Sequence, residues 1–149
     1  MNKNLRLINN LESYIDRCDK INTQISHQNI GWHIAHSCRV INTITKTLVS
    51  SNPENAKPRF NVTYYKVILT NYIPRGKAKA PSFVNPSDLI TKEEVLADVA
   101  QAKESIALLS KAGRGQYFTH PVFGDLNRNK TLTFLAVHTN HHLKIIKDI

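Results

Sequence analysis

Residues 127–149, NRNKTLTFLAVHTNHHLKIIKDI, carry the clearest helical pattern in the chain. One side of this pattern recurs every three or four positions, as in a helix that buries a single face: Leu132, Leu135, Thr139, His142, Ile146 and Ile149. His138 and His142 lie four residues apart, so their imidazoles share one helix face and can reach the same ion. A buried face excludes polar rings unless something satisfies them. The segment therefore predicts a long core helix that carries a candidate metal-binding pair.

Three other segments show apolar residues at helical spacing and predict further long helices. They run from about residue 4 to 26, from 30 to 50, and from 91 to about 109. The third begins with a capping box, formed by Thr91 and Glu94, and two glycines after it stop the helix. Together with the last helix, these segments give four amphipathic helices, which is the composition of a helical bundle.

The remaining segments are shorter. Residues 60–72 are expected to be helical, because four residues repeat at helical spacing: Val62, Tyr65, Leu69 and Tyr72. Residues 74–86 are expected to form a long loop, and the aromatic segment 116–127, QYFTHPVFGDLN, a loop that packs over one end of the protein. No segment shows convincing strand alternation. The sequence thus predicts an all-α four-helix bundle with one extra short helix, in a single domain, residues 1–149.

The composition is that of a globular protein, with 41% hydrophobic and 21% charged residues. It excludes a disordered chain, and no apolar run approaches the roughly 20 residues of a membrane span. The first residues lack the apolar core of a secretion signal. Cys18 and Cys38 are too few for a disulfide framework, and each is expected to be a buried, reduced thiol within a helix. These observations predict a soluble cytoplasmic protein without a membrane partner.

The net charge of +9 is uneven along the chain. No acidic residue lies between Glu54 and Asp88, whereas six basic residues do: Lys57, Arg59, Lys66, Arg75, Lys77 and Lys79. This basic stretch, residues 55–87, either attracts an anionic substrate or is simply a solvated surface, which is the plainer interpretation. Nucleic-acid binding is not expected, because no helix-turn-helix, zinc-finger or RNA-binding signature accompanies the charge.

A third metal ligand is available in the second helix, where WHIAH at 32–36 contains two histidines. Catalytic zinc sites usually combine three protein ligands with water, and imidazoles from two packed helices can bridge the roughly 8–10 Å between their axes. His33 and His36 lie three residues apart, so either can point inward. The alternative is that each histidine is an ordinary residue satisfied by hydrogen bonds, which fits one ring better than the whole set. We interpret the set as a three-histidine metal site.

With these residues in view, the chain resembles the DinB-like (YfiT-type) superfamily of metal-binding four-helix bundles. GWHIAH at 31–36 and HTNHH at 138–142 carry the resemblance, and FTHPVFGDL at 118–126 is similar to the His-Pro-Phe-Phe-Gly segment of one uncharacterised branch. The resemblance covers the whole chain in helix order. It implies an up-down-down-up bundle with a long crossover after the second helix. It also implies a set of metal ligands: His36, His138 and His142.

The superfamily is associated with zinc and nickel, and dimers are common in it. Its characterised members are thiol transferases, mycothiol-dependent isomerases or suspected hydrolases. The resemblance therefore implies a metal-dependent enzyme with transferase-like or hydrolase-like chemistry on a small-molecule substrate, such as a low-molecular-weight thiol, and a homodimer. The alternative function is a non-catalytic metal-binding or stress-associated bundle. A fourth protein ligand would indicate a structural site, whereas an open coordination position indicates a catalytic one.

Four further residues are candidates for supporting roles around the metal: His33, His120, His141 and Trp32. His33 and His141 are neighbours of the ligands, and either would close the site if it also coordinated the ion. His120 is a candidate proton shuttle, or alternatively a residue that packs the aromatic segment. Trp32 is expected to pack near the metal, with stacking on the substrate as the alternative.

Overall fold

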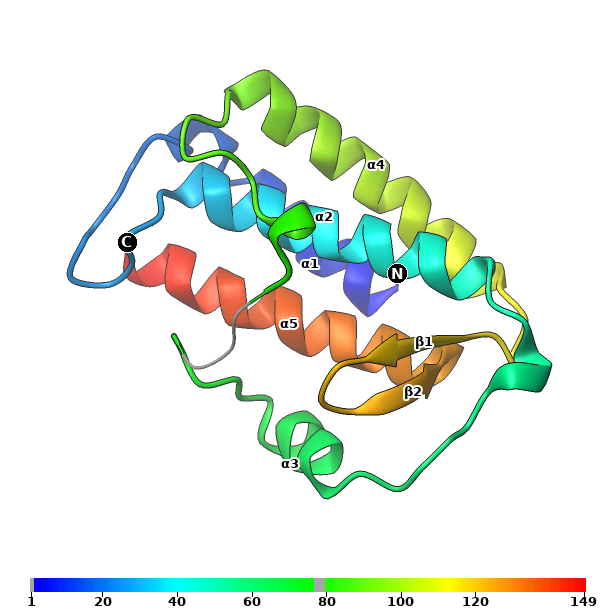
Figure 1. Cartoon of the computed structure of the whole chain (residues 1–149). Coiled ribbons are helices and arrows are strands. Elements are labelled where there is room, and N and C mark those ends of the chain that lie inside the picture. The colour runs from blue at the N-terminus through cyan, green and yellow to red at the C-terminus, as the bar shows by residue number, and fades with distance from the viewer. Residues whose placement is uncertain (1, 77–79) are drawn as a thin grey trace.

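The computed structural model describes residues 2–76 and 80–149, and this part of the chain is mostly helical (Figure 1). Its helices are α1 (Lys3–Glu12), α2 (Ile30–Val49), α3 (Val62–Thr70), α4 (Lys92–Lys111) and α5 (Arg128–Asp148). Two short strands, β1 (Tyr117–His120) and β2 (Gly124–Asn127), pair in an antiparallel hairpin. Short 3-10 helical turns lie at Ile15–Arg17, Pro53–Asn55 and Ser82–Val84.

Helices α1, α2, α4 and α5 pack around one apolar core. Helices α2 and α4 run side by side in the same direction, and α1 and α5 run the opposite way (Figure 1). The chain passes from the end of α2 to the start of α4 through a long connection that contains α3. Fully buried side chains from all four helices form the centre of the core: Ile8, Leu11, Ile34, Ile41, Val99, Leu109, Leu135 and Ile146. Each helix buries its apolar stripe against the other three.

The prediction for the first helix is wrong in its second half. Residues 18–29 are irregular apart from turns, and Asn22 Oδ1 caps one of these turns by accepting a backbone N–H two residues further on, at 3.2 Å. Ile21, an apolar residue within the predicted helix, is exposed. The segment is tied instead to the start of α2, where the Gly31 N–H donates to the Cys18 carbonyl at 2.8 Å. A Cβ at Gly31 would lie 3.1 Å from Cys18, so this close approach favours glycine.

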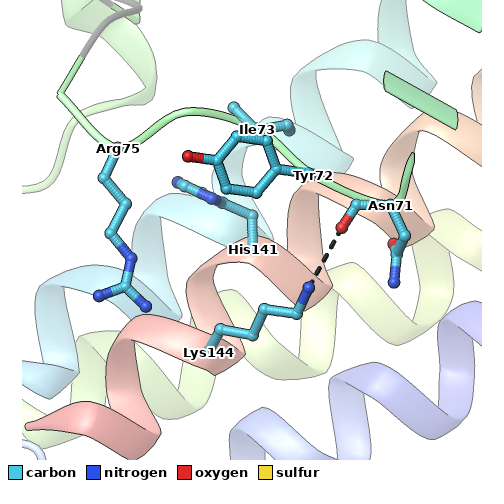
Figure 2. Close-up of a pocket in the computed structure, with 6 residues that line it drawn as sticks. All are labelled: Asn71, Tyr72, Ile73, Arg75, His141 and Lys144. Atoms are coloured by element: carbon cyan, nitrogen blue, oxygen red, sulfur yellow. Dashed lines mark hydrogen bonds between the residues drawn. The ribbon is translucent and has the colours of Figure 1, made fainter. Parts of the chain in front are cut away.

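Helix α3 is confirmed as a helix, but the repeat that predicted it faces solvent. Val62 is 69% exposed and Leu69 is 83% exposed. The inward side carries Tyr64, which is 4% exposed and donates its hydroxyl to a backbone carbonyl of α5 at 3.1 Å. After α3, the chain is held against α5 by Lys144, whose Nζ donates to the Asn71 carbonyl at 3.1 Å (Figure 2). Tyr64 and the partly buried Val67 and Ile68, and not the predicted apolar stripe, therefore hold the helix on the core.

The aromatic segment 116–127 contains a hairpin and is not a loop throughout, so the all-α prediction is wrong on this point. His120 pairs with Gly124, whose φ of 72° favours glycine. His120 Nδ1 closes the turn by accepting two of its backbone N–H groups, at 3.1 and 3.3 Å. Phe123 and Leu126 are buried, so the segment does pack onto the core. Each strand has four residues, which is too short for a visible alternation.

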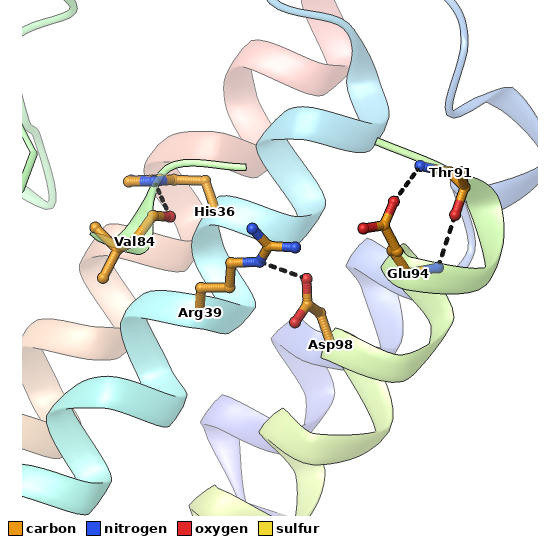
Figure 3. Close-up of polar contacts among 6 residues, drawn as sticks. All are labelled: His36, Arg39, Val84, Thr91, Glu94 and Asp98. Carbon is orange, nitrogen blue, oxygen red and sulfur yellow. Dashed lines mark hydrogen bonds and ion pairs between the residues drawn. The ribbon is translucent and has the colours of Figure 1, made fainter. Parts of the chain in front are cut away.

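Helices α2 and α4 are joined by a partly buried ion pair, in which Arg39 Nε lies 2.7 Å from Asp98 Oδ2 (Figure 3). Burial raises the pKa of Asp98, although Arg39 opposes this effect. The predicted capping box is confirmed at the start of α4. The Glu94 N–H donates to Thr91 Oγ1 at 3.2 Å, and the Thr91 N–H donates to Glu94 Oε2 at 2.8 Å. In the same view the His36 side chain extends from α2 on the side away from α4. Helix α2 can therefore pack against α4 and also present His36 to a site on its other side.

Two further sequence predictions concern cysteines and charge. Cys18 and Cys38 are both free, and Cys38 is fully buried, which raises the pKa of its thiol. Cys18 is half-buried and follows a 3-10 turn, so its predicted place within a helix is wrong. In the basic stretch, Lys77 and Lys79 lie outside the described residues. Among the helices that the structure describes, none is long and apolar enough to cross a membrane.

Candidate metal site

Three imidazoles from two helices converge inside the protein. His36 comes from α2, His138 and His142 come from α5, and one ring nitrogen of each lies within 4.8 Å of the others. The ring centroids of His138 and His142 are 4.7 Å apart, and that of His36 lies 5.4 and 4.9 Å from them, respectively. The four-residue spacing on α5 places its two rings on one face. The structure thus brings together the three residues that the family resemblance implied as ligands.

His36 is oriented by a backbone carbonyl. Its Nδ1 lies 3.1 Å from the Val84 oxygen (Figure 3). Because a carbonyl only accepts, Nδ1 carries the proton of the neutral ring, and Nε2 has a free lone pair. Trp32 stacks on the His36 ring, with centroids 4.9 Å apart and planes 8° from parallel. Trp32 therefore packs against a candidate ligand, and the ligand is held in one tautomer and one orientation.

His138 has an unsatisfied nitrogen. The ring is half-buried as a whole, but its Nδ1 atom is shielded from solvent and has no hydrogen-bond partner among the described residues. Such an atom costs roughly 1–3 kcal/mol unless something satisfies it. The ring lies next to Phe134 on one side and His142 on the other. An ion bound by the three rings would give the His138 ring a partner that the described protein groups do not provide.

His142 is held by another histidine, His33. The two Nδ1 atoms are 3.0 Å apart, and His33 Nε2 lies 2.9 Å from Ser26 Oγ. His33 is 4% exposed and His142 is 7% exposed, so this contact is buried. Both nitrogens of His33 are engaged, and neither remains for an ion.

Burial keeps these four rings neutral. It lowers the pKa of His33 to about 4, lowers the pKa of His36, and lowers the pKa values of His138 and His142 well below the ordinary 6.5. Neighbouring imidazoles lower the pKa further at His33, His138 and His142, whereas the Val84 hydrogen bond opposes the shift at His36. Neutral imidazole is the form that binds metal. The cluster therefore presents nitrogen donors at neutral pH.

The cluster forms part of the wall of a cavity of about 740 Å³. All seven histidines of the chain line this cavity. Much of the remaining wall is apolar or aromatic: Trp32, Val40, Ile44, Phe83, Phe118 and Phe134. Among the described residues that line it, Arg75 is the one charged side chain, and there is no carboxylate. The protein itself would therefore leave the positive charge of a bound ion uncompensated.

His141 lies outside the three-donor cluster, although its ring meets that of His142 edge-on with centroids 5.0 Å apart. It faces a second cavity of about 60 Å³, which Arg75 and Lys144 also line (Figure 2). Burial, together with these two cations, lowers the pKa of His141 to about 4. Arg75 in turn pairs with Asp148 at 2.6 Å. The small cavity is thus a basic recess beside the candidate ligands.

His120 also lines the main cavity, at the end of β1 and outside the donor cluster. Its ring stacks on Phe123 with centroids 4.2 Å apart and meets Phe134 edge-on at 4.9 Å. Because Nδ1 accepts the N–H groups of the hairpin turn, Nε2 carries the proton. Burial lowers the pKa of His120 to about 4. The loop-packing role considered for this residue is therefore fulfilled, and one N–H remains available as a donor.

Two hydrogen-bond partners of the buried histidines were missed by sequence reasoning. Val84 acts through its backbone carbonyl, which every residue carries, so no side-chain signal could reveal it. Ser26 was assigned to the end of a helix that stops much earlier. The polar run at 26–29 was the one signal that the chain turns there before α2 begins.

No curated protein and no solved structure matches the chain. A family model described as "Protein of unknown function (DUF1569)" matches residues 1–148. The match spans all five helices, the hairpin and the histidine cluster. The chain therefore belongs to the DUF1569 family.

Proposed function

We propose that the chain is a metal-dependent enzyme that holds a divalent ion through His36, His138 and His142. The observation that carries this proposal is the convergence of three ring nitrogens within 4.8 Å, on the wall of a cavity large enough for a small substrate. Zinc or nickel is the proposed ion, because imidazole nitrogen suits both. The substrate is proposed to be a small molecule that enters the cavity beside the ion.

The residues present fit such an ion. The three rings are neutral, His36 has a free Nε2, and the buried Nδ1 of His138 has no partner among the described residues. Structural zinc sites are usually closed by four protein ligands, whereas catalytic sites keep one position open. The cluster contains three donors in the described part of the chain, and His33 is fully engaged elsewhere. These observations support a catalytic role over a structural one.

The fold also supports a metal site between facing helices. We propose that the chain is a single-domain, DinB-like four-helix bundle with the order up, down, down, up. The directions of α1, α2, α4 and α5 support this, as does the long connection between α2 and α4 (Figure 1). In such a bundle, sites are built from side chains on facing helices, as His36 on α2 and the pair on α5 are here.

A divalent ion on three neutral imidazoles supplies a Lewis acid that lowers the pKa of a bound water or thiol. The residues of the chain orient and shield this chemistry. Trp32 holds His36 by stacking, and the apolar wall keeps water away from the reacting groups. His120 carries its proton on Nε2 and can donate a hydrogen bond to a substrate on the same wall. A thiol nucleophile gives transferase-like chemistry, and water gives hydrolase-like chemistry.

The charges around the cavity favour a substrate with an anionic group. Arg75 lines the cavity, Lys144 lines the adjoining recess, and no carboxylate opposes them among the described lining residues of the main cavity. A carboxylate on the substrate could therefore meet Arg75 in place of Asp148 while the reactive end approaches the histidines. A low-molecular-weight thiol that carries a carboxylate meets both requirements.

Metal analysis of the untagged protein tests the proposal. We expect about one divalent ion per chain in the wild type, bound by three ligands that fit one ion. In His142→Ala the affinity is expected to fall by more than the roughly 10–100-fold that outer-shell changes cause. His27→Ala is the matched control, because it also removes an imidazole from the cavity wall but lies outside the cluster. Equal metal content in the wild type and His142→Ala would contradict the proposal.

Activity assays then separate the reaction classes. The metal-loaded and chelator-treated proteins are supplied with a small thiol and an electrophile, and separately with a small ester. Metal-dependent thiol transfer would support the transferase-like function, and metal-dependent ester cleavage the hydrolase-like one. Tight metal binding without turnover in either assay would favour the alternative of a non-catalytic metal-binding bundle.

A further inference from the structure

We infer that His33 positions His142 for metal binding by holding it in one tautomer, and that Ser26 completes this hydrogen-bond chain. The inference rests on the proposed metal site and adds two residues to it. Three contacts form a continuous path. His142 Nδ1 lies 3.0 Å from His33 Nδ1, His33 Nε2 lies 2.9 Å from Ser26 Oγ, and Ser26 Oγ accepts the Gln28 N–H at 3.1 Å.

The contact between the two Nδ1 atoms allows two arrangements. A neutral imidazole carries one proton, so one Nδ1 donates and the other accepts. If His142 donates, its Nε2 is unprotonated and can bind an ion. If His33 donates, His142 carries its proton on Nε2, its Nδ1 accepts the hydrogen bond, and neither nitrogen is free. Metal binding by His142 therefore requires the arrangement in which His33 accepts.

The same choice fixes the proton at Ser26. When His33 Nδ1 accepts, His33 Nε2 carries the proton and donates to Ser26 Oγ. In the other arrangement the Ser26 hydroxyl turns and donates to His33 Nε2, so Ser26 follows the tautomer of His142. Ser26 lines the main cavity. Metal binding would therefore leave the Ser26 hydroxyl proton free to donate elsewhere, at the wall where a substrate would lie.

Burial strengthens the hydrogen bonds between His142, His33 and Ser26. His33 and His142 are almost fully buried, so few solvent-exposed positions remain from which water could replace a lost partner. The outer nitrogen of a metal-binding histidine usually donates to a carboxylate, a carbonyl or water, and its loss costs about 10–100-fold in metal affinity. His36 has such a partner in the Val84 carbonyl. For His142 the partner is His33, whose neutral ring adds no charge to the site.

The test compares Zn²⁺ affinity, measured by competition with a chelating indicator, in the full chain. His33→Phe keeps a ring but removes the acceptor, and its affinity is expected to be about 10–100-fold weaker than that of the wild type. His33→Asn places an acceptor near the position of Nδ1 and is expected to recover part of the loss. His27→Phe makes the same change at an exposed position beside Ser26, and its affinity is expected to be unchanged.

Ring ¹⁵N NMR provides a readout that a merely structural role of His33 would not move. The shifts distinguish protonated from unprotonated imidazole nitrogens. In the Zn²⁺-loaded wild type we expect the proton on Nδ1 of His142 and on Nε2 of His33. Thermal unfolding of metal-free His33→Phe checks that this variant folds. If it does not fold, His33→Asn and the wild-type spectrum decide the question.

The outcomes separate the inference from the proposed function. Equal Zn²⁺ affinity in the wild type and a folded His33→Phe would overturn the inference and leave the three-histidine site standing. A proton on His33 Nδ1 in the loaded protein would have the same consequence. Failure of the wild type to bind either Zn²⁺ or Ni²⁺ would instead overturn the proposed function, and the inference with it.

Discussion

At the scale of single residues, His138 is expected to lower the stability of the metal-free protein while serving as a proposed metal ligand. Its Nδ1 atom is shielded from solvent and lacks a partner in the described part of the chain, although His142, a second member of the candidate cluster, lies on the same helix face. His36, by contrast, has its outer nitrogen satisfied by Val84. A residue kept at an energetic cost in the metal-free protein is typical of a binding site.

This contrast leads to a prediction for His138→Leu. The substitution removes an unsatisfied polar atom, so the metal-free protein is expected to gain about 1 kcal/mol in its free energy of unfolding, while metal binding is lost. Urea unfolding of metal-free proteins measures the change. His36→Leu is the control, because it strands the Val84 carbonyl and is expected to be destabilising by about 1–3 kcal/mol. Equal destabilisation by both substitutions would show that His138 is satisfied in solution.

At the scale of elements, α3 shows what periodicity can and cannot establish. The repeat of Val62 and Leu69 identified a helix correctly, but both side chains are exposed. Helical spacing defines a face without stating whether that face is buried. Tyr64, which lies outside the repeat, is the most buried residue of the helix, and Val67 and Ile68 pack on the core beside it.

A matched pair of leucine substitutions tests this orientation. Leu69→Ala is expected to change the free energy of unfolding by no more than about 0.5 kcal/mol, because the side chain is 83% exposed. Leu135→Ala removes the same atoms from a fully buried position on α5 and is expected to cost about 2–5 kcal/mol. Urea unfolding again provides the measurement. A comparable loss in both variants would mean that the α3 stripe is covered in solution.

For the other elements, the accuracy of the prediction followed the strength of the local sequence signal. Helices α2, α4 and α5 are long, and each has a side-chain cap, so their predicted starts agree closely with the structure. The first helix was extended too far, because apolar residues in the turns at 18–29 happened to continue its spacing. The hairpin was missed because its strands are short and its turn depends on Gly124 in a left-handed conformation.

The candidate site was likewise only partly predictable from the sequence. A spacing of four on one helix indicated His138 and His142. The two histidines of α2, which lie three residues apart, offered His33 or His36 as a third ligand. The choice of His36 came from resemblance, because spacing alone left both open. The structure separates them by their partners: His36 joins the donor cluster, and His33 supports His142 from outside it. Such long-range pairing has no signature in a single sequence.

At the scale of the whole molecule, the candidate site joins two helices from distant parts of the chain. His36 lies in the first half of α2, and the other two candidate ligands lie in α5, against which both α1 and α2 pack. The three nitrogens come together only when these helices are packed, so an ion is expected to bind the folded chain and not the unfolded one. Ligand binding of this kind adds directly to the free energy of unfolding.

Metal removal is therefore expected to lower the thermal stability of the whole molecule. With free Zn²⁺ at about 100 times its dissociation constant, binding contributes about 2.7 kcal/mol, which corresponds to roughly 5–10 °C in Tm for a chain of this size. Thermal unfolding with Zn²⁺ and with a chelator measures the difference. His27→Phe is expected to keep this difference, whereas His142→Ala is expected to abolish it, because it removes one of the three proposed ligands. An equal Zn²⁺ response in His142→Ala would place the ion elsewhere and remove the link between metal binding and the packing of α2 on α5.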